Sequence, residues 1–320
     1  MTVPQGPYKG FVGEEPEYEQ FAAFGPLIGN TDASAAFVLA NECDRLGFEN
    51  NEMGWLTGLV MECYEKGLLT QEQLDGLDMR WGNVEAVREL MRKIAHREGV
   101  GDMLAEGVMR AAQEIGGEAV NFAIHTMKGS TPRGHDHRAR WTEMFDTCTS
   151  STGTMEVGPM SSMAEDALQA IGVESLPHPF SPEKVATFNA KTNGAMLFED
   201  SLGVCRFNAV TNVPMLVKAV NAATGWDMTV EEAMEIGRRA VNLLRAFNMR
   251  HGIGPELDLP STRYGSAPID GPMAGETIRP YWNQMLADYY RLMGWGERGV
   301  PKRETLEVLG IEKVADDLGL

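Results

Sequence analysis

Apolar residues recur at helical spacing along most of this sequence, and the alternating pattern of a half-buried strand is almost absent. The clearest helix covers 230–250, where Thr229 before the helix and Glu232 in its first turn have the spacing of a capping box. Another begins at Ser181, with Pro182 at the first helical position, where a missing N–H costs little. This pattern predicts a mainly α-helical fold.

Helices are expected on both sides of a long loop. Residues 128–162 are rich in Gly, Ser, Thr and His and show no sustained hydrophobic period, so they are predicted to form this loop. Residues 251–277 are predicted to be irregular as well. A domain boundary near residue 128 gives two helical domains, 1–128 and 129–320. The predicted helices are 33–46, 51–67, 83–98, 101–116, 181–203, 229–250, 279–293 and 301–318.

Composition excludes several classes of function. The net charge of −18 argues against nucleic acid or an anionic membrane as the partner, because neither attracts an acidic surface. No apolar run approaches the ~18 residues of a membrane span. Four cysteines without a Cys-x-x-Cys pair argue against a disulfide framework and a complete zinc site, so we expect a reducing, cytoplasmic setting.

One acidic turn occurs twice, as DRLGFE at 44–49 and DSLGVC at 200–205. Gly47 and Gly203 read as ordinary helix C-cap glycines when each is considered alone. Asp44 and Asp200, however, sit where the helix dipole disfavours a negative charge. A carboxylate suits the amino and ring N–H donors of a pterin, and two such turns suit a ligand with two similar halves.

These residues resemble the C-terminal domains 2 and 3 of the tungsten-containing aldehyde ferredoxin oxidoreductase family. Both turns match the Asp-x-x-Gly-Leu-(Asp/Cys) motifs of that family, and EPEYEQ at 15–20 resembles its Gly-Pro-Glu-Tyr-Glu-Thr. MECYEKGLLT at 61–70, RAFNMRHG at 245–252 and the stretch 288–310 resemble further segments. The resemblance covers almost the whole chain and implies two helical domains with a repeated pterin-binding turn.

The resemblance also implies which residues hold the cofactors. The implied groups are a tungsten or molybdenum bis-pyranopterin and a [4Fe–4S] cluster, with Cys205 as the last cysteine ligand of the cluster. Glu49 departs from the usual Asp of the family by one methylene. The implied cofactor-binding residues are Asp44, Gly47, Phe48, Glu49, Thr152, Asp200, Gly203, Val204, Cys205 and Arg206.

Glu19 and Glu156 are the candidate catalytic residues. Glu19, the second glutamate of EYE, matches a family residue proposed to transfer protons, and a carboxylate in a dry pocket suits general acid–base work. The alternative interpretation is that Glu19 only stabilises the first turn of a helix, where the helix dipole favours a negative charge. Glu156, in the stretch TGTMEVGP that begins at Thr152, occupies the position of a histidine in the family. His135 or His137 could restore an imidazole, although a His-rich exposed loop is more often solvated.

A [4Fe–4S] cluster needs four thiolates, and the family supplies three from a Cys-x-x-Cys-x-x-x-Cys segment ahead of the Glu-Tyr-Glu stretch. This sequence holds neither that segment nor the first domain of the family, so we expect an N-terminal domain or partner subunit. The expected activity is oxidation of an aldehyde to a carboxylic acid, with electrons leaving to ferredoxin. Two alternatives remain: a related enzyme acting on an aromatic acyl-CoA, or an orphan half that serves as an interaction module.

Overall fold

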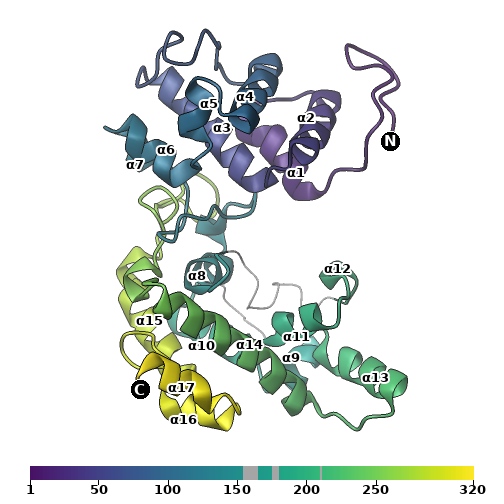
Figure 1. The fold of residues 1–320 in the computed structure, drawn as a ribbon, viewed down its shortest axis with the longest axis vertical. Coiled ribbons are helices and arrows are strands. Elements are labelled where there is room, and N and C mark those ends of the chain that lie inside the picture. Colours follow the sequence, from purple (N-terminus) through teal and green to yellow (C-terminus); the bar gives the residue numbers. More distant parts are fainter. Residues whose placement is uncertain (154–164, 175–179, 210) are drawn as a thin grey trace. The chain divides into compact units, whose positions relative to one another are not determined.

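The computed structural model describes residues 1–153, 165–174, 180–209 and 211–320 (Figure 1). Helices dominate these ranges, which confirms the prediction of a mainly α-helical protein. The β pairing within them amounts to three isolated bridges, Thr2–Val12, Thr126–Pro260 and Trp295–Pro301. No helix among the described residues has both the length and the apolar character that a membrane span requires.

The chain forms two compact units. Unit 1 holds residues 1–136 and a short return segment, 260–264; unit 2 holds 137–259 and 265–320. The return segment is fastened to unit 1 by specific contacts. Ser261 donates its hydroxyl to the carbonyl of Ala123 at 2.8 Å, and its backbone N–H bonds the carbonyl of His125, also at 2.8 Å. Arg263 lies 3.6 Å from the carboxylate of Glu62.

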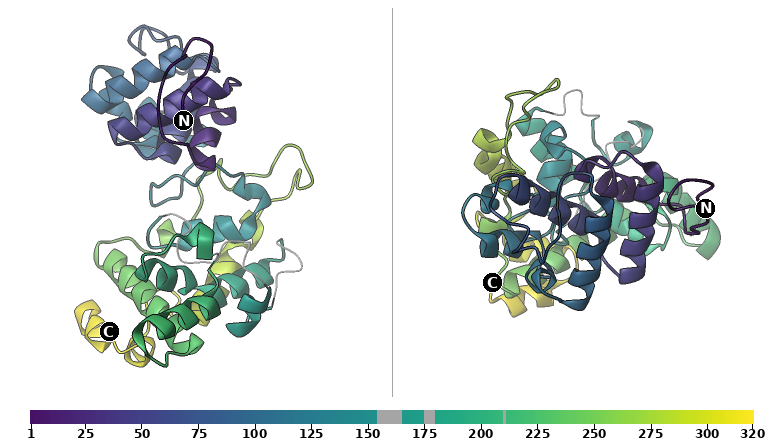
Figure 2. Two further views of the ribbon diagram at one scale, coloured as in Figure 1. Left: turned by 90° about the vertical axis from the view of Figure 1, so that its right-hand side faces the viewer. Right: turned by 90° about the horizontal axis from the view of Figure 1, so that it is seen from above.

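Unit 1 is a cluster of helices around one apolar core. The first helix, α1, packs against α2 and α3, and α2 also contacts α4 (Figures 1 and 2). The core joins residues of all seven α-helices and excludes water from Leu39, Val60 and Leu90. Its elements are α1 (Tyr18–Phe24), η1 (Pro26–Ile28), α2 (Ala33–Leu46), α3 (Asn50–Glu65), α4 (Val84–His96), α5 (Val100–Leu104), α6 (Val108–Ile115) and α7 (Ala119–Phe122).

One expected helix of unit 1 is two helices. The stretch 101–116 breaks between α5 and α6 at Gly107, whose φ is +86°. Glu52 on α3 explains the new start, because its carboxylate accepts a hydrogen bond from the N–H of Val108 at 2.6 Å. A side chain at position 107 would crowd that carboxylate. The break therefore comes from a contact with a distant helix, which local periodicity does not reveal.

Unit 2 holds two groups of packed helices, and the long α14 belongs to one of them. Within the unit, α11 and α13 lie against α14, and α10 lies against α8 and α15. The capping box predicted at Thr229 and Glu232 is present. The elements are η2 (His137–Ala139), α8 (Trp141–Thr149), α9 (Glu165–Ala170), α10 (Pro182–Thr192), α11 (Ala195–Ser201), α12 (Arg206–Ala209), α13 (Val213–Thr224), α14 (Val230–Arg250), η3 (Pro255–Leu257), η4 (Arg279–Tyr281), α15 (Trp282–Leu292), α16 (Arg303–Val308) and α17 (Glu312–Leu318).

Two expectations for this unit were wrong. The predicted loop 128–162 contains a helix, α8, which is buried on nearly every side. The predicted helix 181–203 is interrupted between α10 and α11 at Gly194, whose φ is +96°. Gly194 packs directly on Gly237 of α14, and a Cβ on either glycine would collide with the backbone of the other helix. Two helices thus approach closely because neither carries a side chain at the crossing.

A buried ion pair fastens the end of α14 to the irregular segment that follows it. The side chains of Arg245 and Asp258 are fully buried, with Nη2 of Arg245 2.8 Å from Oδ2 of Asp258. Arg245 also donates to the carbonyl of Gly299 at 2.8 Å, and Tyr290 donates its hydroxyl to Asp258. The guanidinium lies over the rings of Tyr290 and Trp295, 5.6 and 5.0 Å from their centroids.

Candidate functional site

The two repeated turns have closely similar backbones. Gly47 directly follows α2 and Gly203 lies just beyond α11, with φ values of +78° and +66°. In each turn the glycine N–H donates to the carbonyl of the aspartate three residues earlier, at 3.0 Å. The first turn adds a bond from Phe48 N–H to the carbonyl of Cys43, which completes a Schellman motif. Open space surrounds the position of a Cβ at both glycines. Backbone can therefore approach a ligand closely at each turn.

Asp44 has an exposed carboxylate that two side-chain amides orient. Oδ2 accepts from Gln20 on α1 and Oδ1 accepts from Asn50 on α3, both at 2.9 Å. A carboxylate has about four lone-pair sites, so each oxygen keeps a free one. The Oδ1 atom of Asn50 is buried and has no hydrogen-bond partner among the described residues. An acceptor left in this way is ready for an N–H donor from a ligand.

Glu49 is the N-cap of α3. Its carboxylate accepts from the backbone N–H of Asn51 at 3.1 Å and of Glu52 at 2.6 Å. Helix capping therefore occupies this carboxylate, and an aspartate, one methylene shorter, would make a more usual cap. Phe48 is half-buried against the core of unit 1. The expected contacts of Phe48 and Glu49 with a pterin stay predictions.

In the second turn, Asp200, Val204 and Cys205 are all exposed. The neighbouring Glu199 is fully buried, and its carboxylate accepts from the backbone N–H of Thr211 at 3.3 Å and from its hydroxyl at 3.0 Å. Thr211 has a φ of +54°, an unusual conformation for a β-branched residue. These bonds fasten the end of α11 to the segment after α12, so they hold the exposed turn in place.

The cysteines differ sharply in accessibility. Cys205 is exposed, whereas Cys43, Cys63 and Cys148 are buried. Burial raises the pKa of the Cys43 thiol to about 12 and that of Cys63 to about 11, and nearby carboxylates add to both shifts. In the described ranges no three His, Cys, Asp or Glu side chains are grouped so as to hold a metal ion. The ligand role of Cys205 stays a prediction.

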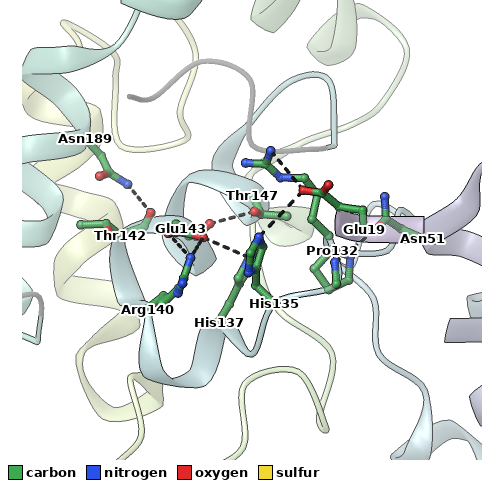
Figure 3. A network of polar contacts seen from close by, with 12 residues as sticks. Glu19, Asn51, Pro132, His135, His137, Arg140, Thr142, Glu143, Thr147 and Asn189 are labelled. Atoms are coloured by element: carbon green, nitrogen blue, oxygen red, sulfur yellow. Dashed lines mark hydrogen bonds and ion pairs between the residues drawn. The ribbon is translucent and has the colours of Figure 1, made fainter. Parts of the chain in front are cut away.

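Glu19 lies on α1 and faces two basic side chains from a distant loop (Figure 3). Its Oε1 atom is 3.8 Å from Nε2 of His135 and 3.9 Å from Nη1 of Arg133. The three side chains are mostly shielded from solvent, with 14% of Glu19, 22% of His135 and 17% of Arg133 exposed. Tyr18 stacks on the ring of His135, with centroids 4.9 Å apart. Of the two histidines suggested by the sequence, His135 is therefore the one beside Glu19.

His137 belongs to unit 2 and contacts a different carboxylate. Its Nε2 atom lies 3.4 Å from Oε2 of Glu143 on α8, and both side chains are buried (Figure 3). Arg140 reaches the same carboxylate at 3.1 Å. His125 is also buried, and burial lowers its pKa.

The remaining candidate residues lie at or beyond the edges of the described structure. Thr152 is exposed, and its hydroxyl lies 2.8 Å from that of Ser150. Glu156 lies outside the described residues, and so does the side chain of Arg206.

Sequence reasoning missed Gln20, Asn50 and Arg133. Gln20 and Asn50 come from different helices and orient Asp44 only after folding brings them together. Asn50 did carry a signal, because it directly follows the DRLGFE motif. Arg133 lies in the same loop as His135, but nothing in the sequence links that loop to α1.

The helical architecture and the paired turns correspond to a known class of oxidoreductases. The sequence matches the family model described as aldehyde ferredoxin oxidoreductase, domains 2 & 3, over residues 1–311. The chain belongs to the aldehyde ferredoxin oxidoreductase family.

Several curated relatives are similar over most of this chain. The tungsten-containing aldehyde ferredoxin oxidoreductase of Pyrococcus furiosus is 34% identical over 305 residues, which cover 93% of this chain and 49% of the relative. A second protein of that organism, named aliphatic sulfonate oxidoreductase, WOR-like subunit, is 31% identical over 320 residues, which cover 96% of this chain and 47% of the relative. The chain thus spans about half the length of the curated relatives it matches.

A solved structure has a similar fold. It is described as the active site complex BamBC of benzoyl coenzyme A reductase with 1,5-dienoyl-CoA. The TM-score is 0.73 at 22% identity, and the match covers 94% of this chain and 49% of that chain. This likeness concerns the fold.

Proposed function

We propose that this chain forms the C-terminal part of a tungsten-dependent oxidoreductase that converts an aldehyde to a carboxylic acid. The matched turns at Asp44–Gly47 and Asp200–Gly203 carry the proposal, because each presents a carboxylate beside an open glycine. The membership of the family and the names of the relatives support it. The part of the relatives that lies outside this chain would come from another domain or a partner subunit.

Each turn offers groups that fit one pyranopterin. Asp44 offers free lone pairs, and Asn50 offers a buried acceptor without a partner among the described residues. Gly47 and Gly203 leave room for a ligand to reach the backbone. These acceptors match the N–H donors of a pterin ring. Asp44, Gly47 and Asn50 would hold one pterin, and Asp200 and Gly203 would hold the other.

The exposed thiol of Cys205 fits a ligand of an iron–sulfur cluster. Such a cluster needs four thiolates. The buried state of Cys43, Cys63 and Cys148 supports the view that the other three come from outside this chain. The cluster would pass electrons singly to ferredoxin or another electron carrier.

The proposed reaction consumes water and releases two protons and two electrons for each aldehyde oxidised. When bound, the tungsten cofactor supplies the two-electron chemistry. Glu19 takes up the proton from the water that adds to the aldehyde carbon, since a shielded carboxylate suits general base catalysis. Arg133 attracts the carboxylate and keeps it facing its loop.

Metal analysis tests the cofactor part of the proposal. The chain is purified anaerobically together with the partner or domain that completes it, and tungsten and iron are measured by mass spectrometry. Asp44→Asn and Asp200→Asn should each weaken cofactor retention, because a hydrogen bond to a charged group contributes about 1.5–3 kcal/mol, roughly 10–100-fold in affinity. Asp227→Asn is the control, because Asp227 is exposed and its substitution removes one negative charge, as the two turn variants do.

Substrate oxidation is measured on the loaded complex with an electron-accepting dye. An aliphatic aldehyde and an aliphatic sulfonate are compared with this dye at equal concentration, and an aromatic acyl-CoA is tested separately with a reduced dye as electron donor. Turnover of the aldehyde with release of the acid is the expected result. Tungsten retention that is the same in the two turn variants as in the wild type would contradict the pterin assignment.

A further inference from the structure

Glu19 is faced by two cations that differ in chemistry. The guanidinium of Arg133 stays charged at all physiological pH values and cannot exchange a proton. The imidazole of His135 gains and loses a proton near neutral pH. Both lie within 4 Å of the same oxygen of Glu19, at 3.9 and 3.8 Å. Of the two, His135 alone can therefore take a proton from this carboxyl group.

The loop that carries His135 is fixed by hydrogen bonds from α3. Trp55 donates its indole N–H to the carbonyl of Pro132 at 2.7 Å, and Thr131 donates to the carboxylate of Glu52 at 2.8 Å. The backbone N–H of Gly134 donates to Asn51 at 3.0 Å. The three partners on α3, Asn51, Glu52 and Trp55, lie near the start of that helix and hold the loop against the unit.

Close packing against α1 fixes the loop from the other side. A Cβ at Gly134 would lie 2.9 Å from the Cβ of Ala22, so a larger residue would push the loop away from α1. Tyr18 stacks on the ring of His135 at an interplanar angle of 16°. The imidazole is thus held in one orientation, with Nε2 toward Glu19.

We propose that His135 is the proton-exchange partner of Glu19. The O–H bond of the protonated Glu19 carboxyl breaks and an N–H bond forms at Nε2 of His135, which leaves a carboxylate and an imidazolium. The imidazolium then loses its proton to solvent, since the side chain of His135 is more exposed than that of Glu19, 22% against 14%. A water molecule that hydrogen-bonds both Oε1 of Glu19 and Nε2 of His135 would carry the proton across the 3.8 Å between them. The catalytic use of this pair rests on the proposed function, whereas the pair itself belongs to the folded chain.

Several charged or titratable groups act on the His135 ring. From α1, the Glu19 carboxylate stabilises the imidazolium, and the Tyr18 ring lies over it. From its own loop, Arg133 opposes the imidazolium, and Asp136 follows it directly in the sequence. From α3, Glu52 approaches only the far end of the loop, at Thr131. Glu19 therefore favours the imidazolium form of His135, and Arg133 disfavours it.

Nuclear magnetic resonance of histidine-labelled chain measures this coupling without any cofactor. The Cε1–H resonance of His135 is assigned by its loss in His135→Gln and is followed against pH. Glu19→Gln should lower the titration midpoint of His135 by about one pH unit, because an opposite charge within ~4–6 Å favours the charged form. Arg133→Gln should raise it. Glu15→Gln removes an exposed carboxylate from the segment before α1 and should leave it unchanged.

A midpoint that stays within experimental error in Glu19→Gln overturns the proposal. In the completed enzyme, His135→Ala should lower kcat more than KM, and added imidazole should restore part of the rate. Absence of rescue in a folded, metal-loaded His135→Ala enzyme would also count against the proton role, since a merely structural contact is not replaced by free imidazole. A coupled titration without aldehyde oxidation would refute the proposed substrate and leave the Glu19–His135 pair in place.

Discussion

The buried pair of Arg245 and Asp258 should contribute strongly to the stability of unit 2. Both side chains are fully buried, and the guanidinium is matched by the carboxylate and by the carbonyl of Gly299. Burial opposes the charge of Arg245, but the attraction and hydrogen bond of Asp258 outweigh it, so the pKa of Arg245 is raised. Asp258→Asn keeps the size of the side chain and removes only the negative charge. The variant therefore leaves a charged guanidinium without its counter-ion in the interior.

The expected loss is about 3 kcal/mol or more, since breaking one partner of a buried pair typically costs ~3–5 kcal/mol. For a unit of this size the midpoint of thermal unfolding should fall by roughly 6–12 °C. Replacing both residues, as Arg245→Met with Asp258→Leu, removes the stranded charge and should recover much of the loss. A double variant that is more stable than Asp258→Asn indicates that the single variant loses stability through an unpaired charge. A double variant that is less stable indicates loss of packing.

Urea unfolding followed by tryptophan fluorescence is the assay, with far-UV circular dichroism as a second probe. Asp316→Asn is the matched control in the same unit, because Asp316 pairs with Arg303 at 2.9 Å on the exposed surface. An exposed pair contributes about 0–1 kcal/mol. If Asp258→Asn costs less than ~1 kcal/mol, the reasoning about the buried charge fails.

Three further outcomes are expected. Burial raises the pKa of Glu52 above its ordinary 4.5, and a raised acid pKa makes the folded state less stable as pH rises through it. Glu52→Gln should therefore gain stability relative to wild type as pH increases toward neutrality. Urea unfolding of both proteins at several pH values checks this, and a difference in stability that does not change with pH would contradict it. Gly237→Ala should destabilise unit 2 by ~1–3 kcal/mol in thermal unfolding, because its methyl group would collide with the backbone of Gly194. Iodoacetamide at about pH 8 should label Cys205 well before Cys43, because Cys205 is exposed and burial raises the thiol pKa of Cys43 to about 12. Peptide mapping that finds both cysteines labelled at the same rate would refute this difference in accessibility.

Local sequence signals correctly predicted the helices that begin with a clear N-terminal capping residue. The capping box at Thr229 and Glu232 and the Ser181–Pro182 start both mark real helix beginnings. The missed helix α8 starts after Arg140, with no side-chain cap. Its polar and β-branched residues are buried among neighbouring helices, so tertiary packing, rather than local propensity, makes this segment helical. Long-range packing also explains the breaks at Gly107 and Gly194.

The sequence placed Asp44 and Asp200 at the ends of helices, because Asp-x-x-Gly followed by an apolar residue is a local pattern. The surroundings of Glu19 could not be predicted in the same way. His135 reaches α1 through a loop whose anchors on α3 are 77–83 residues away along the chain. No periodicity spans such a separation, so only the folded structure distinguishes His135 from His137.

The return segment 260–264 affects the order in which the two units can be completed during synthesis. Unit 1 lacks its contacts with Ser261 and Arg263 until the ribosome has also made residues 137–259 of unit 2. At about 5–20 residues per second, that interval lasts roughly 6–25 s. During this time the edge formed by Glu62, Ala123 and His125 stays open on the nascent chain. Unit 1 is therefore the first to begin folding, but it cannot finish until most of its neighbour has been translated.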